Sequence, residues 1–398
     1  SAGGGSSPSA WRRPDDRPQE KKKALRMQGL FRIINPSTGT QTKSKRKCRL
    51  VLDKPLSREE MIRVVEGRGA ARRIPIAVQH WVSPSAMGPN EAECRRILET
   101  YPCDFEKISF RIPDVFTAPA DDPSYRWMNC DNPFPPGTPL DAVSAIEDWD
   151  QLDRILADFP DPCYPGLIPE DAPPVGDRYR VGLWWYWLFE RFWSLRGMEN
   201  ALCDFYENPE QVHRLFRRLT DFYKVMLRRG REELHLDAVW TSDDIGTQTA
   251  PFFSPKIFRE FFKPYYQELV AYAHELGMHF WLHCCGNILA FLPDLIEIGV
   301  DVLHPIQKYT MDEREVAQKY GKDLCIWAGF DVQRIIPYGT PEDVRREVRF
   351  LLDTYARPEG RLILAAGNNM TPDTPMESLE ALLDEALRYG EEVCKRFH

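Results

Sequence analysis

Residues 278–287 read Met-His-Phe-Trp-Leu-His-Cys-Cys-Gly-Asn. The apolar run that ends at Leu282 is typical of a buried strand, and the glycine and asparagine that close the stretch allow a sharp turn. An imidazole, His283, and two thiols, Cys284 and Cys285, therefore stand where a strand ends and a loop begins. In barrel enzymes, the chemistry takes place at this end of the strands.

Outward from this segment, strand and helix patterns alternate from about residue 55 to the end of the chain. The predicted strands are 74–81, 106–112, 179–187, 237–241, 278–283, 300–304, 324–329 and 361–366. A helix with a serine cap is predicted to start at Ser57, and further helices are predicted at 208–234, 254–277, 288–298, 311–320, 340–356 and 375–397.

This alternation predicts an α/β fold, a TIM (β/α)8 barrel. A long Pro-, Asp- and Gly-rich insertion at 113–178 follows the early strands. No GxGxxG or GxxxxGK motif follows an early strand, so the sequence does not support a nucleotide-binding doubly wound sheet.

Residues 1–54 differ from the rest of the chain, because they are rich in Gly and Ser at 1–9 and basic at 21–23 and 43–47. We predict a flexible or loosely docked arm here and a barrel domain over 55–398. A basic tail could contact an acidic partner, but a solvated tail is the preferred interpretation.

Bulk composition excludes several classes of protein. The formal net charge of −8 argues against a nucleic-acid binder. No run of about 18 apolar residues is present, so no membrane span is expected. The N-terminus lacks the apolar core of a secretory signal. Ten scattered cysteines are not a disulfide framework, which predicts a reducing, cytoplasmic setting.

Polar and aromatic side chains recur at the carboxyl ends of the predicted strands, which meet on one face of a barrel. Most of these side chains are expected to shape a pocket rather than react. The alternative interpretation is packing: His80 as a buried ring, and the tryptophans as core. The predicted substrate-binding residues are His80, Trp184, Trp185, Gln307, Asp331 and Asn368.

His283 and Cys285 are spaced i, i+2 and therefore point to the same side of an extended strand. Imidazole and thiolate suit zinc, although a buried thiol beside a hydrogen-bonded histidine would share this spacing. Cys284 should point the opposite way and pack against a helix. Asp244 could be a general acid or base, a metal ligand or a hydrogen-bond anchor, and Asp243 a solvated acid or a cap.

Several ordered motifs resemble the uroporphyrinogen decarboxylase superfamily, which also contains corrinoid-dependent methyltransferases. They cover most of residues 55–395 and run Asp-Asp-Ile-Gly-Thr-Gln at 243–248, His-Cys-Cys-Gly at 283–286, Ile-Gly-Val-Asp-Val-Leu-His-Pro-Ile-Gln at 298–307, Gly-Phe-Asp-Val-Gln at 329–333 and Gly-Thr-Pro-Glu-Asp-Val-Arg at 339–345. The resemblance implies the barrel fold, and the reaction depends on the site.

Two departures bear on the choice of branch. The decarboxylases carry an arginine-bearing segment after the first strand, whereas residues 79–87 hold no arginine. The zinc methyltransferases resemble this chain at His283 and Cys285 but take a third cysteine from the last strand's end. Residues 365–370 hold none, so an oxygen ligand such as Asp244 would have to replace it.

The resemblance therefore implies a methyltransferase that moves a methyl group between a small methylated substrate, for example a methyl ether, and a corrinoid (cobalamin) carried by a partner protein. Asp244, His283 and Cys285 are its predicted catalytic and zinc-binding residues. A decarboxylase or lyase acting on a smaller acid is the first alternative, and a non-catalytic ligand-binding barrel is the second. The open mouth of the barrel is expected to dock a partner or a second copy in a homodimer.

Overall fold

The computed structural model describes residues 53–112, 144–157 and 161–397. Most of the predicted arm 1–54 and half of the predicted insertion 113–178 thus lie outside the described residues. The domain boundary near residue 54 stays a prediction.

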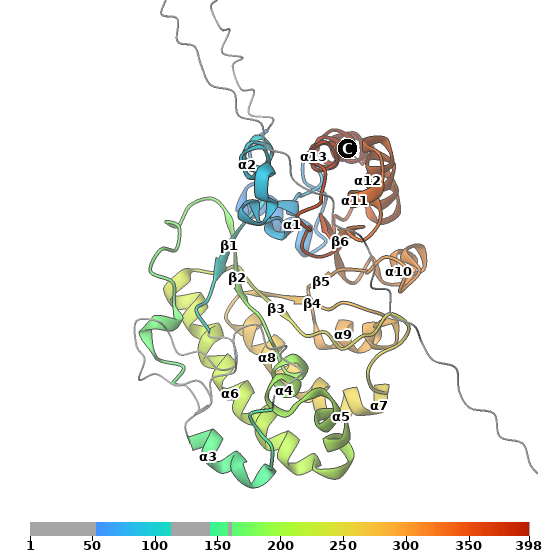
Figure 1. Ribbon diagram of the computed structural model, residues 1–398. Coiled ribbons are helices and arrows are strands. Elements are labelled where there is room, and N and C mark those ends of the chain that lie inside the picture. The colour runs from blue at the N-terminus through green and yellow to red at the C-terminus, as the bar shows by residue number, and fades with distance from the viewer. Residues whose placement is uncertain (1–52, 113–143, 158–160, 398) are drawn as a thin grey trace, which may run out of the picture. The chain divides into compact units, whose positions relative to one another are not determined.

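Seven parallel strands form one curled sheet in chain order, with helices between them (Figure 1). Each strand pairs with the next one along the chain, which is the arrangement that repeated right-handed βα units produce. The strands are β1 Phe105–Ser109, β2 Tyr179–Trp184, β3 Ala238–Ser242, β4 His279–His283, β5 Val302–His304, β6 Cys325–Phe330 and β7 Leu362–Ala366.

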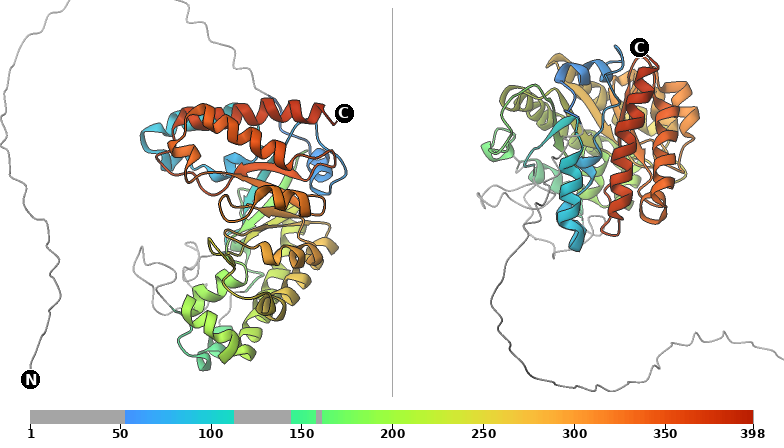
Figure 2. Two further views of the ribbon diagram at one scale, coloured as in Figure 1. Left: turned by 90° about the vertical axis from the view of Figure 1, so that its right-hand side faces the viewer. Right: turned by 90° about the horizontal axis from the view of Figure 1, so that it is seen from above.

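Helices cover the outer face of the sheet. Figure 2 shows α2, α13 and α12 side by side on one flank, and α8 packs between α6 and α9 elsewhere. The helices are α1 Arg58–Val65, α2 Glu91–Thr100, α3 Leu152–Ala157, α4 Phe189–Arg196, α5 Met198–Glu207, α6 Pro209–Leu234, α7 Pro255–Ile257, α8 Lys263–Glu275, α9 Leu292–Ile298, α10 Glu313–Tyr320, α11 Ile335–Tyr338, α12 Pro341–Tyr355 and α13 Met376–Lys395. No helix in the described ranges has the length and apolar character that a membrane crossing requires.

The predicted helix starts agree with the observed caps. The Ser57 side chain accepts the Glu60 N–H, and the Glu60 side chain accepts the Ser57 N–H in return. Thr340 and Asp343 make the same reciprocal pair at α12. Such a capping box satisfies backbone donors that have no partner inside the helix, which is why these two starts could be predicted to the residue.

Tryptophans fill the inside of the curled sheet. Trp240, Trp281 and Trp327 come from three different strands, and their ring centroids lie 4.8 to 5.3 Å from Trp327. Trp81 packs on the same cluster at 5.7 Å from Trp327. All four side chains are buried. This aromatic layer makes the interior a packed core below the carboxyl ends of the strands.

The predicted strand 74–81 is wrong in extent. Ile76 forms one isolated parallel bridge to Leu364 of β7, and residues 78–81 form a turn of 3₁₀ helix. The neighbouring backbone still bonds to both edges of the sheet: the Ala77 N–H donates to Leu364 O at 2.9 Å, and the Asp104 N–H donates to Ile76 O at 2.9 Å. This short segment therefore lies between β7 and β1 without becoming a regular strand.

A histidine–aspartate hydrogen bond links α8 to the residue before β5. His274, in the last turn of α8, lies 2.8 Å from Asp301, and this hydrogen bond raises the pKa of His274. Because the pKa of His274 is higher in the folded than in the unfolded chain, the pair stabilises the fold fully at a pH below the unfolded-state pKa. This stabilisation is lost as the pH rises through the folded-state pKa. We expect His274→Gln to cost more stability at about pH 5.5 than at about pH 8.5, by at most about 1 kcal/mol for a pair this exposed. Urea unfolding at both pH values measures this, and an equal cost at both would contradict it.

Candidate metal and substrate site

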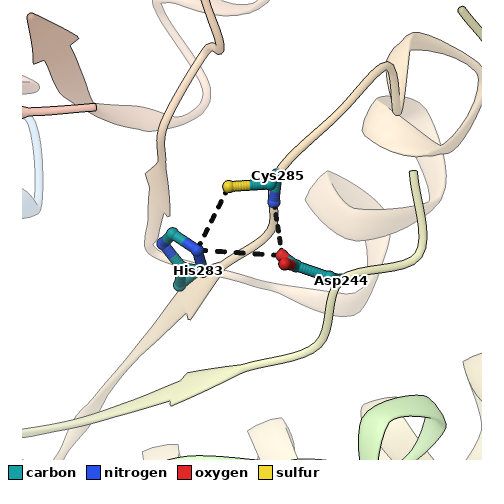
Figure 3. Close-up of side chains that lie close together, drawn as sticks. All are labelled: Asp244, His283 and Cys285. Carbon is teal, nitrogen blue, oxygen red and sulfur yellow. Dashed lines mark hydrogen bonds and ion pairs between the residues drawn. The ribbon is translucent and has the colours of Figure 1, made fainter. Parts of the chain in front are cut away.

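Three side chains with metal-binding atoms meet just beyond the carboxyl ends of β3 and β4 (Figure 3). Asp244 follows β3 by two residues, His283 ends β4, and Cys285 follows it. One ligand atom of each lies within 4.8 Å of the others. His283 and Cys285 project together, as their i, i+2 spacing predicts, whereas Cys284 is buried away from them and accepts the Ile245 N–H.

Two of the three distances between these atoms are close to those of a metal site. The Cys285 Sγ lies 3.4 Å from the His283 Nε2, and the Asp244 Oδ1 lies 3.7 Å from the same nitrogen. In a tetrahedral zinc site, ligand atoms about 2.0 to 2.3 Å from the ion lie roughly 3.3 to 3.7 Å from one another. One nitrogen, one sulfur and one oxygen are also a donor set that zinc accepts. The residues therefore fit a zinc ion that leaves one position open.

The loop around Cys285 needs glycine to take its shape. Gly286 has φ 89°, and a Cβ there would lie 2.4 Å from the backbone carbon of Gly246. The Gly286 N–H donates to Gln307 Oε1 at 2.6 Å, and the Cys285 N–H donates to Asp244 Oδ1 at 2.6 Å. These bonds hold the thiol beside the imidazole, so the glycine after the two thiols has a positional reason.

A second histidine sets the protonation of His283. The His304 Nε2–H donates to Ala366 O at 2.8 Å, because a carbonyl oxygen can only accept. Burial lowers the pKa of both histidines, so both rings are neutral. His304 Nδ1 is then an acceptor, and it takes the His283 Nδ1–H at 2.7 Å. The Nε2 of His283 consequently keeps its lone pair free toward Cys285 and Asp244, as a metal ligand must.

A pocket of about 350 Å³ opens next to Cys285. Its lining includes Gln307, Asp331 and Asn368, three of the predicted substrate-binding residues. The Asn368 Nδ2 donates to the Cys285 Sγ at 3.6 Å, so this hydrogen bond joins the pocket lining to the cluster of Asp244, His283 and Cys285. Asp331 accepts the Tyr309 hydroxyl at 2.7 Å. The structure thus gathers these side chains around one space beside the thiol.

The two predicted tryptophans separate. The Trp185 ring lies 5.1 Å from that of His283, next to the three side chains. Trp184 points the other way and packs on Trp187 and Tyr223 in the layer between sheet and helices. Its placement in the substrate pocket is a wrong prediction. Side chains alternate along a strand, so adjacent tryptophans could not both face the pocket.

His80, predicted to bind substrate, also lies elsewhere. Its Nε2 lies 3.2 Å from the backbone oxygen of Phe105, the first residue of β1, and 3.2 Å from the Cys103 Sγ. Burial lowers the pKa of His80 to about 3, so the ring is neutral. His80 therefore packs near the amino end of β1, away from the thiol and imidazole of the cluster.

Asp243 and Asp244 take different roles, although they are adjacent. Asp243 is fully buried, accepts the Glu190 N–H at 2.8 Å and the Tyr266 hydroxyl at 2.6 Å, and so holds the first turn of α4. Burial raises the pKa of Asp243 to about 6. It is a cap rather than a solvated loop acid, which leaves Asp244 as the acid that faces His283.

Two site neighbours were assigned no role from the sequence. His304 ends β5, so its place at a strand end was a usable signal, but its role requires the contact with His283. Glu190 is a buried carboxyl in α4 whose Oε2 has no hydrogen-bond partner, and burial with nearby Asp244 and Asp243 raises its pKa. Nothing local in the sequence marks Glu190, because α4 is brought to the site by packing alone.

Comparison with known proteins finds a family match over about half of this chain. Residues 193–389 match the family model described as uroporphyrinogen decarboxylase (URO-D). The chain thus carries a URO-D family domain, and the predicted family resemblance is confirmed.

Its relatives in this family are enzymes of two kinds. A methylated-thiol–coenzyme M methyltransferase of Methanosarcina mazei is 28% identical over 195 residues, 47% of this chain and 47% of that protein. A uroporphyrinogen decarboxylase of Xanthomonas oryzae pv. oryzae is 26% identical over 194 residues, 45% of this chain and 50% of that protein. The match thus spans about half the length of these curated relatives.

A solved structure resembles a larger part of the chain. A methyltransferase from Methanosarcina mazei superposes with a TM-score of 0.51 at 14% identity and covers 84% of this chain and 99% of its own. At this identity the likeness supports the α/β fold with its curled parallel sheet and leaves the chemistry open.

Proposed function

We propose that this protein is a methyltransferase that moves a methyl group from a small methyl thioether or methyl ether to a corrinoid held by a partner protein. The observation that carries the proposal is the meeting of Asp244, His283 and Cys285, whose ligand atoms lie within 4.8 Å of one another. The relationship to a methylated-thiol methyltransferase supports the same reaction class.

In this proposal the three side chains hold zinc. Zinc bound there would act as a Lewis acid on the sulfur or oxygen that carries the methyl group. Asp244 also fixes the loop through the Cys285 N–H, and Asn368 orients the thiol. Reduced cobalt of the partner's corrinoid would supply the acceptor for the methyl carbon, and the electron pair of the broken bond would stay on the sulfur or oxygen.

The pocket beside Cys285 favours a substrate with few negative charges. The described residues that line it include no arginine, and its cation Lys308 is already bound by Glu347 at 2.5 Å and Glu313 at 3.2 Å. A polycarboxylic substrate would need unpaired cations there. The pocket therefore favours methyl transfer over decarboxylation of a porphyrin-like acid.

A closed barrel belongs to the same proposal. We infer that residues 74–77 stand in for an eighth strand between β7 and β1, since their backbone bonds to both edges of the sheet. A closed barrel would direct the ends of all the strands into one mouth, where the corrinoid partner or a second copy of the chain would dock.

The experiment is metal analysis of the purified protein together with a methyl-transfer assay. Methyl thioethers and methyl ethers are offered with reduced cobalamin as acceptor, and methylcobalamin is followed by its absorbance. We expect close to one zinc per chain and turnover of at least one donor. Carbon dioxide release from a carboxylic acid without cobalamin would support a decarboxylase instead, and tight donor binding without turnover would support a binding protein.

Replacement of His304 tests how the metal site is oriented. His304→Phe keeps the ring that stacks on Trp81 at 4.3 Å but removes the acceptor for the His283 Nδ1–H. Loss of such a supporting hydrogen bond typically lowers metal affinity by about 10- to 100-fold. Zinc competition against a fluorescent chelator measures this, with His213→Phe as the control at a histidine on α6. Unchanged zinc affinity in His304→Phe would show that His304 does not orient His283.

A further inference from the structure

A second pocket lies at the opposite end of the sheet from the metal-binding cluster, which is Asp244, His283 and Cys285. It is an open hollow of about 710 Å³, and its charged lining comes from segments next to the amino ends of β2 and β3 and from the ends of α1 and α6. Those lining side chains are Arg58, Arg178, Arg180, Arg231, His235 and Asp237. Four guanidinium groups and a single carboxylate therefore face the same space.

Two of the arginines are neutralised by acids. Arg58 lies 2.6 Å from the Asp237 Oδ1, and Arg180 lies 3.1 Å from the Glu106 Oε2. Asp237 is buried and also accepts the Arg180 backbone N–H at 3.0 Å, so its second oxygen is occupied as well. Neither acid forms an ion pair with Arg178 or Arg231.

Arg178 and Arg231 have no acidic partner within the described ranges. Arg178 donates to the backbone oxygen of Cys103, and Arg231 donates to that of Leu236 at 2.9 Å. The Arg178 Nε is buried without any hydrogen-bond partner. A buried guanidinium N–H left unpaired is costly, and two uncompensated positive charges in one pocket repel each other. An anion bound between the two arginines would offset this repulsion.

We propose that this arginine pocket, defined by Arg58, Arg178, Arg180 and Arg231, binds a small anion with two or more negative charges. Guanidinium groups match phosphate and carboxylate oxygens with paired N–H donors, so a phosphate ester or a polycarboxylate has the required chemistry. A singly charged anion would leave one of the two free arginines uncompensated. The proposal is independent of the methyl-transfer chemistry, because none of these residues lies near the metal-binding cluster.

The test is isothermal titration calorimetry of the full chain at low salt, with pyrophosphate, tripolyphosphate and citrate as probes. We expect one binding site per chain for a phosphate probe or for citrate. The probe that binds shows whether the natural ligand carries phosphate or carboxylate groups. Arg178→Gln with Arg231→Gln should weaken that binding by at least about tenfold, since each charged hydrogen bond lost costs about that factor. Arg231→Gln alone leaves the bond from Arg178 to Cys103 intact, so it provides a second test if the double variant does not fold.

A matched control removes two positive charges elsewhere. Arg346 and Arg388 are exposed and each pairs with a surface acid on its own helix, so Arg346→Gln with Arg388→Gln changes the net charge equally. This control should bind the probe within about twofold of the parent. The proposal fails if the parent binds none of the three probes, or if the control and the pocket variants weaken binding equally.

Discussion

The double replacement His283→Ala, Cys285→Ser is expected to leave a folded protein that retains no zinc and has lost methyl transfer by at least about a thousandfold. Two of the three ligand atoms would be removed, and the remaining Asp244 carboxylate cannot hold zinc alone. Metal content by mass spectrometry and the rate of methylcobalamin formation are the two measurements. Circular dichroism would establish that the fold is kept.

The matched control is His274→Ala with Cys203→Ser, which removes an imidazole and a thiol that lie outside the site and are solvent-accessible. It should keep the parent's zinc content and its rate within about twofold. If the site variant still transfers methyl groups at the parental rate, zinc chemistry at this cluster is excluded. If zinc is lost while the rate is kept, the metal is structural and another group carries the reaction.

A large loss of stability is expected for Asp104→Asn. Asp104 is fully buried, bonds the buried Arg73 guanidinium at 2.6 and 2.8 Å, and accepts the backbone N–H groups of Leu56 and Ile76. Breaking a buried pair leaves an uncompensated charge, which costs about 3 to 5 kcal/mol. Urea unfolding of the variant should show this decrease. The segment between β7 and β1 should also be held less firmly, because Asp104 accepts the Ile76 N–H.

An exposed aspartate provides the control. Asp221 pairs with Arg217 one turn away on α6 and is more than half exposed, so Asp221→Asn should change the free energy of unfolding by less than about 0.5 kcal/mol. Adding Arg73→Met to Asp104→Asn should recover part of the loss, because the unpaired charge is then gone. A cost below about 1 kcal/mol for Asp104→Asn would mean that Arg73 is adequately held by Asp53.

Much of the fold could be predicted from local pattern. The apolar run before His283 is β4, and Asn208 with Pro209 does begin a helix that ends at Leu234. These elements have strong hydrophobic periodicity and definite caps, which act within a few residues of sequence. The π-helical segment Phe258–Phe262 inside the predicted helix 254–277 was not predictable, because it inserts extra residues without a composition signal.

Long-range contacts decided the rest. Residues 74–81 have the composition of a strand, but their backbone is shared between two sheet edges, and only Ile76 pairs as a strand residue would. His80 and Trp184 lie in polar or aromatic stretches beside predicted strand ends, yet one packs on Phe105 and the other on helix α6. The sequence predicts that a residue lies near the carboxyl end of a strand. It does not predict whether the side chain points into the pocket or into the packing between sheet and helices.

The sequence by itself determined that an imidazole and a thiol share one side of a strand end, because the two-residue period of extended backbone requires it. The tertiary structure alone brought Asp244 from β3 to within 3.7 Å of that imidazole and placed His304 behind it. It also brought four arginines from three segments of the chain around one pocket at the other end of the sheet. Periodicity acts over neighbouring residues, whereas these contacts depend on how the whole sheet curls and on which helices pack against it.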